Sequence, residues 1–203
     1  RARLSFSGKK PSRLSAFLAG HPKAAATIAA SSLLLDVPIR PPAHSALFGN
    51  GTTLRIPQKR KTVLRITDGK NVVIEGFHFT GGVYGIVIER STDILLRNNS
   101  VTGTEKRPVT VLGRSSGIYI VQNRIEGNRR GGVYLQGEIR GGLIQDNDIA
   151  SNESSSNWAA GLVLSHLPVK QGEPLDACFK EEDFHWPKPF GSIAEHIKAP
   201  HEL

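Results

Sequence analysis

Arg124 and Asp148 carry the side chains of a candidate catalytic pair, and 24 residues separate them along the chain. An Arg can neutralise the carboxylate of an acidic substrate, and an Asp can bind a cation or move a proton. The alternative is an ordinary ion pair between neighbouring turns of the chain, which contributes little to stability. Both interpretations require a fold that brings residues 24 apart side by side.

Two basic segments supply further candidates for a site. The first contains Lys106 and Arg107, and the second contains Arg129 and Arg130. In successive turns of a repeating fold these segments would occupy the same loop and form a subsite for an acidic sugar. Tyr134 adds a hydroxyl that can move a proton beside such a sugar. The alternative is that the basic residues are solvated loop charges.

Two histidines complete the candidate substrate-binding set. His78 is expected in one outward column with Ser100, Arg124 and Asp148, and His166 in a second column of the neighbouring strand.

We expect no metal site. The histidines near Cys178 fit no zinc spacing, and Asp146 with Asp148 supplies only a minimal start for calcium, which takes more oxygen ligands.

A repeat in the sequence predicts the structural elements that would position these residues. Asn99, Asn123 and Asn147 recur every 24 residues, each between two aliphatic positions. An Asn at such a bend can satisfy backbone groups and also bond to the Asn of the next turn. Phe77 holds the same position in an earlier copy. The inner aliphatic positions of the copies are Leu96, Ile120 and Ile144, then Val101, Ile125 and Ile149. A period of this length with short strands indicates a solenoid.

A second series of strands follows the first at a similar interval, with the period-two alternation of a sheet that has one buried face. Its members are residues 85–88, 109–112, 132–135 and 161–164. Strand, turn, strand and loop in this order resemble the right-handed parallel β-helix of the pectate-lyase-like superfamily. The resemblance covers about residues 24–166 and implies an all-β, right-handed parallel β-helix solenoid.

The two ends of the chain differ from the repeat. Residues 1–23 are expected to cap the solenoid with a short helix that has Ser12 as its N-cap, buries Leu14, Phe17 and Leu18, and ends at Gly20. Residues 167–203 lack the repeat and are rich in Pro. They are expected to form an irregular cap over the last coil, a disordered tail, or an excursion to further coils.

Composition limits the partners. The net charge of +8 and the pI near 9.9 favour polyanions, either acidic polysaccharides or nucleic acid. Nucleic acid is the poorer choice because aromatic residues make up only 6% of the chain and no groove-reading motif is present. No apolar run is long enough to span a membrane. The single Cys excludes an intrachain disulfide, and the sequence leaves the oligomeric state open.

The resemblance implies a secreted or periplasmic protein, although the chain shows no signal peptide. Because the chain starts at Arg1 and contains no Met, we expect a processed form or a fragment.

Two functions remain. One is a lyase or C5-epimerase of a uronate-containing polysaccharide, with Arg124, Asp148 and Tyr134 as catalytic residues. The other is a non-catalytic β-helix that binds polysaccharide or serves in adhesion or structure. The Asn-Thr-Asp, Asp-Asp and Gly-His-Gly motifs of polygalacturonase-like hydrolases are absent.

Overall fold

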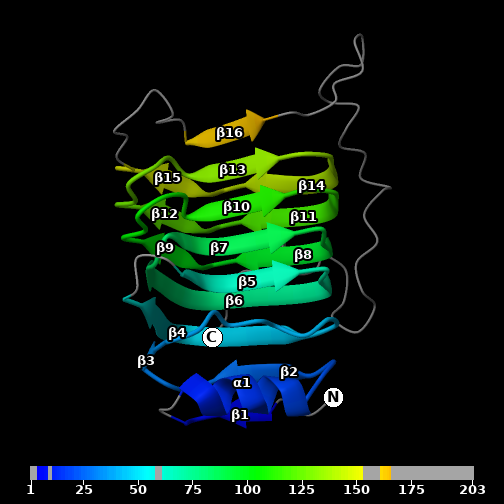
Figure 1. Cartoon of the computed structure of the whole chain (residues 1–203), viewed down its shortest axis with the longest axis vertical. Coiled ribbons are helices and arrows are strands. Elements are labelled where there is room, and N and C mark those ends of the chain that lie inside the picture. The colour runs from blue at the N-terminus through cyan, green and yellow to red at the C-terminus, as the bar shows by residue number, and fades with distance from the viewer. Residues whose placement is uncertain (1–3, 9–10, 58–60, 153–160, 166–203) are drawn as a thin grey trace.

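The computed structural model of the protein describes residues 4–8, 11–57, 61–152 and 161–165. These residues form a parallel β-solenoid of about six turns (Figure 1). All strand pairs within the described residues are parallel, and each joins equivalent segments of successive coils. The all-β solenoid predicted from the repeat is therefore confirmed.

The described strands make two sheets. The first sheet has 11 strands: β1 (Leu4–Phe6), β2 (Ala25–Ile28), β3 (Ser32–Leu34), β4 (Ala46–Ile56), β6 (Lys70–Gly81), β8 (Thr92–Arg97), β9 (Ser100–Thr102), β11 (Ser115–Val121), β12 (Arg124–Glu126), β14 (Ile139–Gln145) and β15 (Asp148–Ala150). The second sheet has five: β5 (Thr62–Thr67), β7 (Tyr84–Glu89), β10 (Val109–Leu112), β13 (Val133–Gln136) and β16 (Leu162–Ser165).

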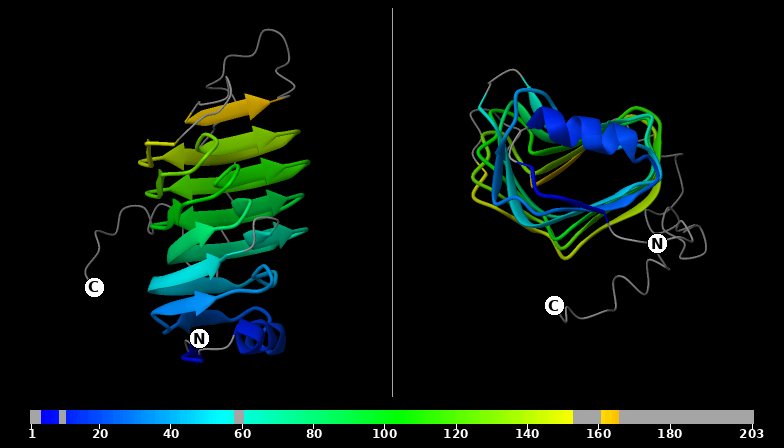
Figure 2. Two further views of the ribbon diagram at one scale, coloured as in Figure 1. Left: turned by 60° about the vertical axis from the view of Figure 1, so that its left-hand side comes forward. Right: turned by 90° about the horizontal axis from the view of Figure 1, so that it is seen from below.

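The first sheet bends and so gives the solenoid two of its sides (Figure 2). We call β2, the first halves of β4 and β6, β8, β11 and β14 the long-strand face, and β3, the second halves of β4 and β6, β9, β12 and β15 the short-strand face. The second sheet forms the remaining side, seen in front in Figure 1. Each coil thus runs from the long-strand face to the short-strand face and through a loop to the second sheet.

The interior is filled by stacks of aliphatic side chains. Ile120 is paired in register with Leu96 below it and Ile144 above it, and it is fully buried. Ile125 is paired in the same way with Val101 and Ile149. Both predicted aliphatic stacks are therefore present, and each coil buries apolar surface only by stacking on its neighbours.

The asparagines at the bend are joined by hydrogen bonds along the solenoid axis. Asn99 donates its backbone N–H (3.0 Å) and its side-chain amide (3.1 Å) to Oδ1 of Asn123, and Asn123 donates the same two groups to Asn147 (2.9 and 3.0 Å). Phe77 begins the stack by donating its N–H to Asn99 (3.1 Å). Each Asn also donates to a carbonyl of the coil before: those of Ile74, Leu96 and Ile120. These bonds satisfy the backbone at the bend.

A second stack lies where the short-strand face ends, and the sequence interpretation missed it. Asn128 accepts hydrogen bonds on Oδ1 from the backbone N–H (3.1 Å) and the hydroxyl (2.9 Å) of Thr104. Asn128 in turn donates to Asn152. The same 24-residue spacing relates these positions, but Thr replaces Asn in the first copy. The loops of successive coils are therefore fixed to one another at their starts.

The N-terminal end is closed by α1 (Pro11–Gly20), which lies across the solenoid in the view from below in Figure 2. Leu14 and Leu18 are buried in the core, and the ring of Phe17 lies 5.4 Å from that of Phe6. The expected N-cap at Ser12 is wrong, because the helix begins one residue earlier. Pro11 occupies the first turn, where its missing N–H is not needed.

The predicted C-terminal segment, residues 167–203, lies outside the described residues, as does His166. The described part of the chain contains no helix that could cross a membrane, since α1 has only ten residues.

Candidate functional site

The predicted outward column is present on the short-strand side of the solenoid. The strand register pairs His78 with Ser100, Ser100 with Arg124, and Arg124 with Asp148. Nε of Arg124 lies 4.0 Å from Asp148 and 2.9 Å from Glu126. The side chains of Arg124 and Asp148 are 63% and 64% exposed. This is the geometry of a solvated surface ion pair, for which the stabilisation is small.

The two basic loops lie side by side as expected. Arg129 donates its backbone N–H to the carbonyl of Thr104 (3.0 Å), which aligns the two loops. The Arg129 guanidinium lies 2.7 Å from Glu105 of the neighbouring loop. Lys106 is exposed. Arg129 is therefore already paired with a carboxylate.

Tyr134 and Arg107 form the centre of a pocket. The guanidinium carbon of Arg107 lies 3.4 Å from the centroid of the Tyr134 ring, a close cation–π contact. A pocket of about 140 Å³ lies beside them. We call it the arginine–tyrosine pocket; its lining residues are Arg107, Arg130, Gly131, Gly132, Val133, Tyr134 and Val163.

Two arginines of this pocket differ from most others in their charge pairing. Arg65, Arg90, Arg97, Arg114, Arg124, Arg129 and Arg140 each lie within 4.0 Å of a carboxylate. Among the residues that the structure describes, no carboxylate pairs with Arg107 or Arg130. Their positive charges are therefore available to an anionic ligand.

The structure brings together only part of the predicted site. Tyr134, Arg107 and Arg130 line one pocket on the second sheet and its loop. Arg124 and Asp148 come from β12 and β15 on the short-strand face, and neither lines this pocket. His78 belongs to the column of that same face. The three residues predicted as catalytic thus belong to two different faces.

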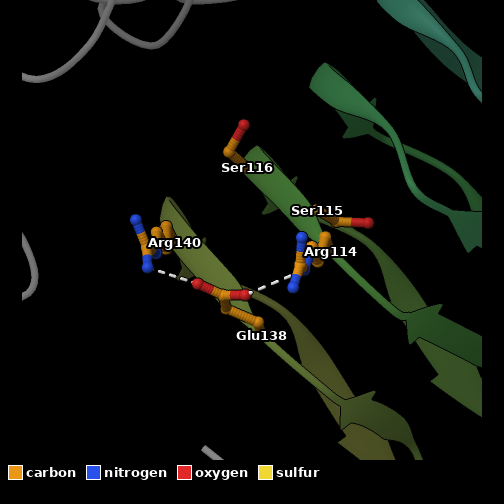
Figure 3. A pocket seen from close by; sticks show the side chains of 5 residues that line it. All are labelled: Arg114, Ser115, Ser116, Glu138 and Arg140. Carbon is orange, nitrogen blue, oxygen red and sulfur yellow. Dashed lines mark hydrogen bonds and ion pairs between the residues drawn. The ribbon is translucent and has the colours of Figure 1, made fainter. Parts of the chain in front are cut away.

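A second hollow lies at the turn between the second sheet and the long-strand face (Figure 3). It has a volume of about 440 Å³ and is lined by Arg114, Ser115, Ser116, Glu138 and Arg140. Figure 3 shows Glu138 between Arg114 and Arg140, and its carboxylate pairs with both guanidinium groups. Nε of Arg114 lies 3.2 Å from Oε2 of Glu138. Because both guanidinium groups already share one carboxylate, this hollow offers less free positive charge than the arginine–tyrosine pocket.

The same turn carries an ion pair one coil below. Arg90 donates a hydrogen bond to Asp68 (2.8 Å), and this bond lowers the pKa of Asp68 from its ordinary value and raises that of Arg90. Both groups are held in their charged forms, which suits a structural pair better than proton transfer.

Metal ligands are not gathered in the described part of the chain. No group of three or more His, Cys, Asp or Glu side chains is placed there to hold a metal ion.

Comparison with known proteins assigns the repeat to a family. Residues 62–166 match a family model described as a right handed beta helix region, which covers just over half of the chain. No curated protein and no solved structure matches the chain.

Proposed function

The chain belongs to the right-handed β-helix family, and from that premise we propose that it binds an acidic, uronate-containing polysaccharide at the arginine–tyrosine pocket. The observation that carries this proposal is the pair of guanidinium groups, Arg107 and Arg130, that line the pocket without a carboxylate partner among the described residues. A guanidinium binds a carboxylate through two parallel hydrogen bonds, so each Arg suits one acidic group.

The stacking of Arg107 on Tyr134 prepares the pocket for such a ligand. The ring holds the guanidinium in one place and thereby reduces the entropy lost on binding. Tyr134 is only 8% exposed beneath it, so the ring offers no open face on which a base could stack. Both features favour a charged sugar over a nucleic acid.

The size of the pocket agrees with the binding of a single sugar unit of the polymer inside it. A volume of about 140 Å³ equals that of roughly five water molecules. It admits a carboxylate and part of one sugar ring, while the remaining units would lie along neighbouring loops. The net charge of +8 adds a long-range attraction for a polyanion. This function predicts a secreted or periplasmic protein.

A lyase or C5-epimerase is the second candidate, and one observation favours it. Tyr134 lines the same pocket as the two arginines. A phenolate there would remove the proton next to the uronate carboxylate while an Arg stabilises the negative charge that develops. Arg124 and Asp148 take no part in this second proposal, because they do not line the pocket.

A panel of polymers tests the proposal. Affinity electrophoresis of the purified chain in alginate, polygalacturonate or chondroitin should show retardation by at least one of them, and neutral glucans should have no effect. Retardation should weaken as salt is added, because the attraction is electrostatic. The proposal of acidic polysaccharide binding would be refuted if no acidic polymer retarded the chain, or if neutral glucans retarded it equally.

The same samples separate binding from catalysis. A new ultraviolet absorbance from unsaturated uronates would identify a lyase, and a change of uronate configuration in the proton NMR spectrum of the polymer would identify an epimerase. Bound polymer that remains unchanged would identify a binding module.

A further inference from the structure

A groove opens on the short-strand face, toward the N-terminal end of the solenoid. It has a volume of about 430 Å³ and lies between β3, β4, β6 and the loop that follows β9. Its polar lining residues are Ser32, Thr53, Arg55, Thr80 and Glu105. We call it the hydroxyl groove. It shares no lining residue with the arginine–tyrosine pocket, so the two are separate sites.

The strand register places four of these side chains on one surface. Thr53 pairs with Ser32 of the coil before, and Arg55 pairs with Thr80 of the coil after. Because Leu54 between Thr53 and Arg55 is buried in the interior, its two neighbours point outward. Strands lie about 4.8 Å apart, so the diagonal from Ser32 to Thr80 spans roughly 12 Å. The surface is therefore long enough for more than one sugar unit.

The polar groups of the hydroxyl groove are not engaged by the described part of the chain. Within it, none of the three Ser and Thr hydroxyls takes part in a hydrogen bond, and no carboxylate pairs with Arg55. Thr52 differs, since it is buried and its hydroxyl donates to the carbonyl of Ile28 (2.7 Å). Glu105 is paired with Arg129 (2.7 Å), which balances its charge. The groove therefore offers three hydroxyls and one guanidinium to a ligand.

Two glycines keep one end of the groove open. Gly81 and Gly82 line it with φ angles of 79° and 74°, in the left-handed region that favours glycine. A Cβ at either position would lie 2.7 Å from a backbone oxygen, that of Ile56 or that of Lys61. Neither position can therefore carry a side chain unless the backbone shifts, and no side chain fills this end of the groove.

We propose that the hydroxyl groove binds the sugar units next to the uronate held in the arginine–tyrosine pocket, so that one polymer chain occupies both. This inference rests on the proposed function. Each Ser or Thr hydroxyl can both donate to and accept from a sugar hydroxyl, and Arg55 adds a charge-assisted bond. With one unpaired guanidinium where the pocket has two, the groove recognises the hydroxyl groups of its ligand more than carboxylates.

One loop joins the two sites at a short distance. Glu105 lines the groove and Arg107 lines the pocket, so their Cα atoms are at most about 7.6 Å apart. The loop is held at Thr104 by its bond to Asn128 (2.9 Å) and at Lys106, whose N–H donates to a carbonyl of the coil before (2.9 Å). A short oligosaccharide can therefore reach both sites, and the second contact becomes intramolecular.

The dependence of affinity on ligand length tests this inference. Titration calorimetry of the full chain compares a disaccharide and a hexasaccharide of the acidic polymer that it binds best. The natural chain should bind the hexasaccharide at least about tenfold more tightly. In a Thr53→Val, Thr80→Val variant most of this gain should disappear, whereas the affinity for the disaccharide, which the pocket alone holds, should stay the same.

Two further variants give the result its meaning. Thr27→Val with Thr102→Val removes two hydroxyls from half-buried strand threonines that do not line the groove, and it should keep the full gain with length. Gly103→Asn should reduce the gain by obstruction, because a Cβ there would lie 3.7 Å from Oγ1 of Thr80. Asn is among the residues that tolerate the positive φ of 65° at this position.

The outcomes separate the groove from the pocket. An equal gain with length in the natural chain and in the Thr53→Val, Thr80→Val variant would overturn the groove while leaving the pocket intact. An equal loss in the Thr27→Val, Thr102→Val control would also overturn it. If neither oligosaccharide bound the natural chain, the proposed function itself would fail, and the groove with it.

Discussion

Ile120→Asp is expected to abolish folding of the solenoid. Ile120 is fully buried, and its side chain lies between Leu96 and Ile144 in the interior stack. The described core offers no cation at this place, so a carboxylate would enter an apolar stack without a partner. Burial of an unpaired charge costs several kcal/mol after relaxation, which is most of the stability of a typical domain. Circular dichroism and size-exclusion chromatography should show an unfolded or aggregated chain.

Two controls separate burial from a general effect of charge. Ile120→Val removes one methyl group and should cost about 1 kcal/mol while the chain remains folded. Arg124→Asp introduces the same carboxylate on an exposed neighbouring strand and should also leave the chain folded. A soluble Ile120→Asp chain that melts cooperatively would contradict the buried position of Ile120.

Asn123→Leu is expected to lower the free energy of unfolding by about 3 kcal/mol. The Asn123 amide donates to the carbonyls of Leu96 and Val121, and its Oδ1 accepts two hydrogen bonds from Asn99. Leu has a similar size but supplies none of these bonds. Because Asn123 is only 4% exposed, water cannot replace them fully. Urea unfolding followed by circular dichroism measures the loss.

Gln145→Leu is the matched control, since it exchanges an exposed amide of β14 for the same apolar side chain. This change should alter the free energy of unfolding by less than about 0.5 kcal/mol. Equal losses in the two variants would mean that the stacked asparagines contribute nothing beyond an ordinary surface amide.

The fold was predictable because the repeat appears directly in the sequence. Aliphatic positions such as Ile120 and Ile125 recur at one spacing, and only stacking of the coils buries them all. The second polar stack was missed because Thr104 takes the place of an Asn. Its signal was nevertheless available, since Asn128 and Asn152 are also 24 residues apart.

The candidate site was less predictable than the fold. Register alone places Arg124 beside Asp148, and the sequence spacing was sufficient to foresee it. The contact of Arg107 with Tyr134 depends on the path of the loop between β9 and β10, which the repeat does not specify. The pairing of Arg129 with Glu105, which leaves Arg130 without that carboxylate, likewise depends on side-chain geometry.

Binding of an acidic polymer by charge-matched variants tests the proposed function most directly. Arg107→Gln with Arg130→Gln removes both pocket guanidinium groups, and Arg40→Gln with Arg114→Gln removes two exposed arginines elsewhere. The dissociation constant for the best acidic polymer, measured by titration calorimetry, should rise at least about tenfold in the pocket variant. The control should change it far less. Equal weakening in the two variants would show that the polymer responds to net charge alone and would contradict a site at the arginine–tyrosine pocket.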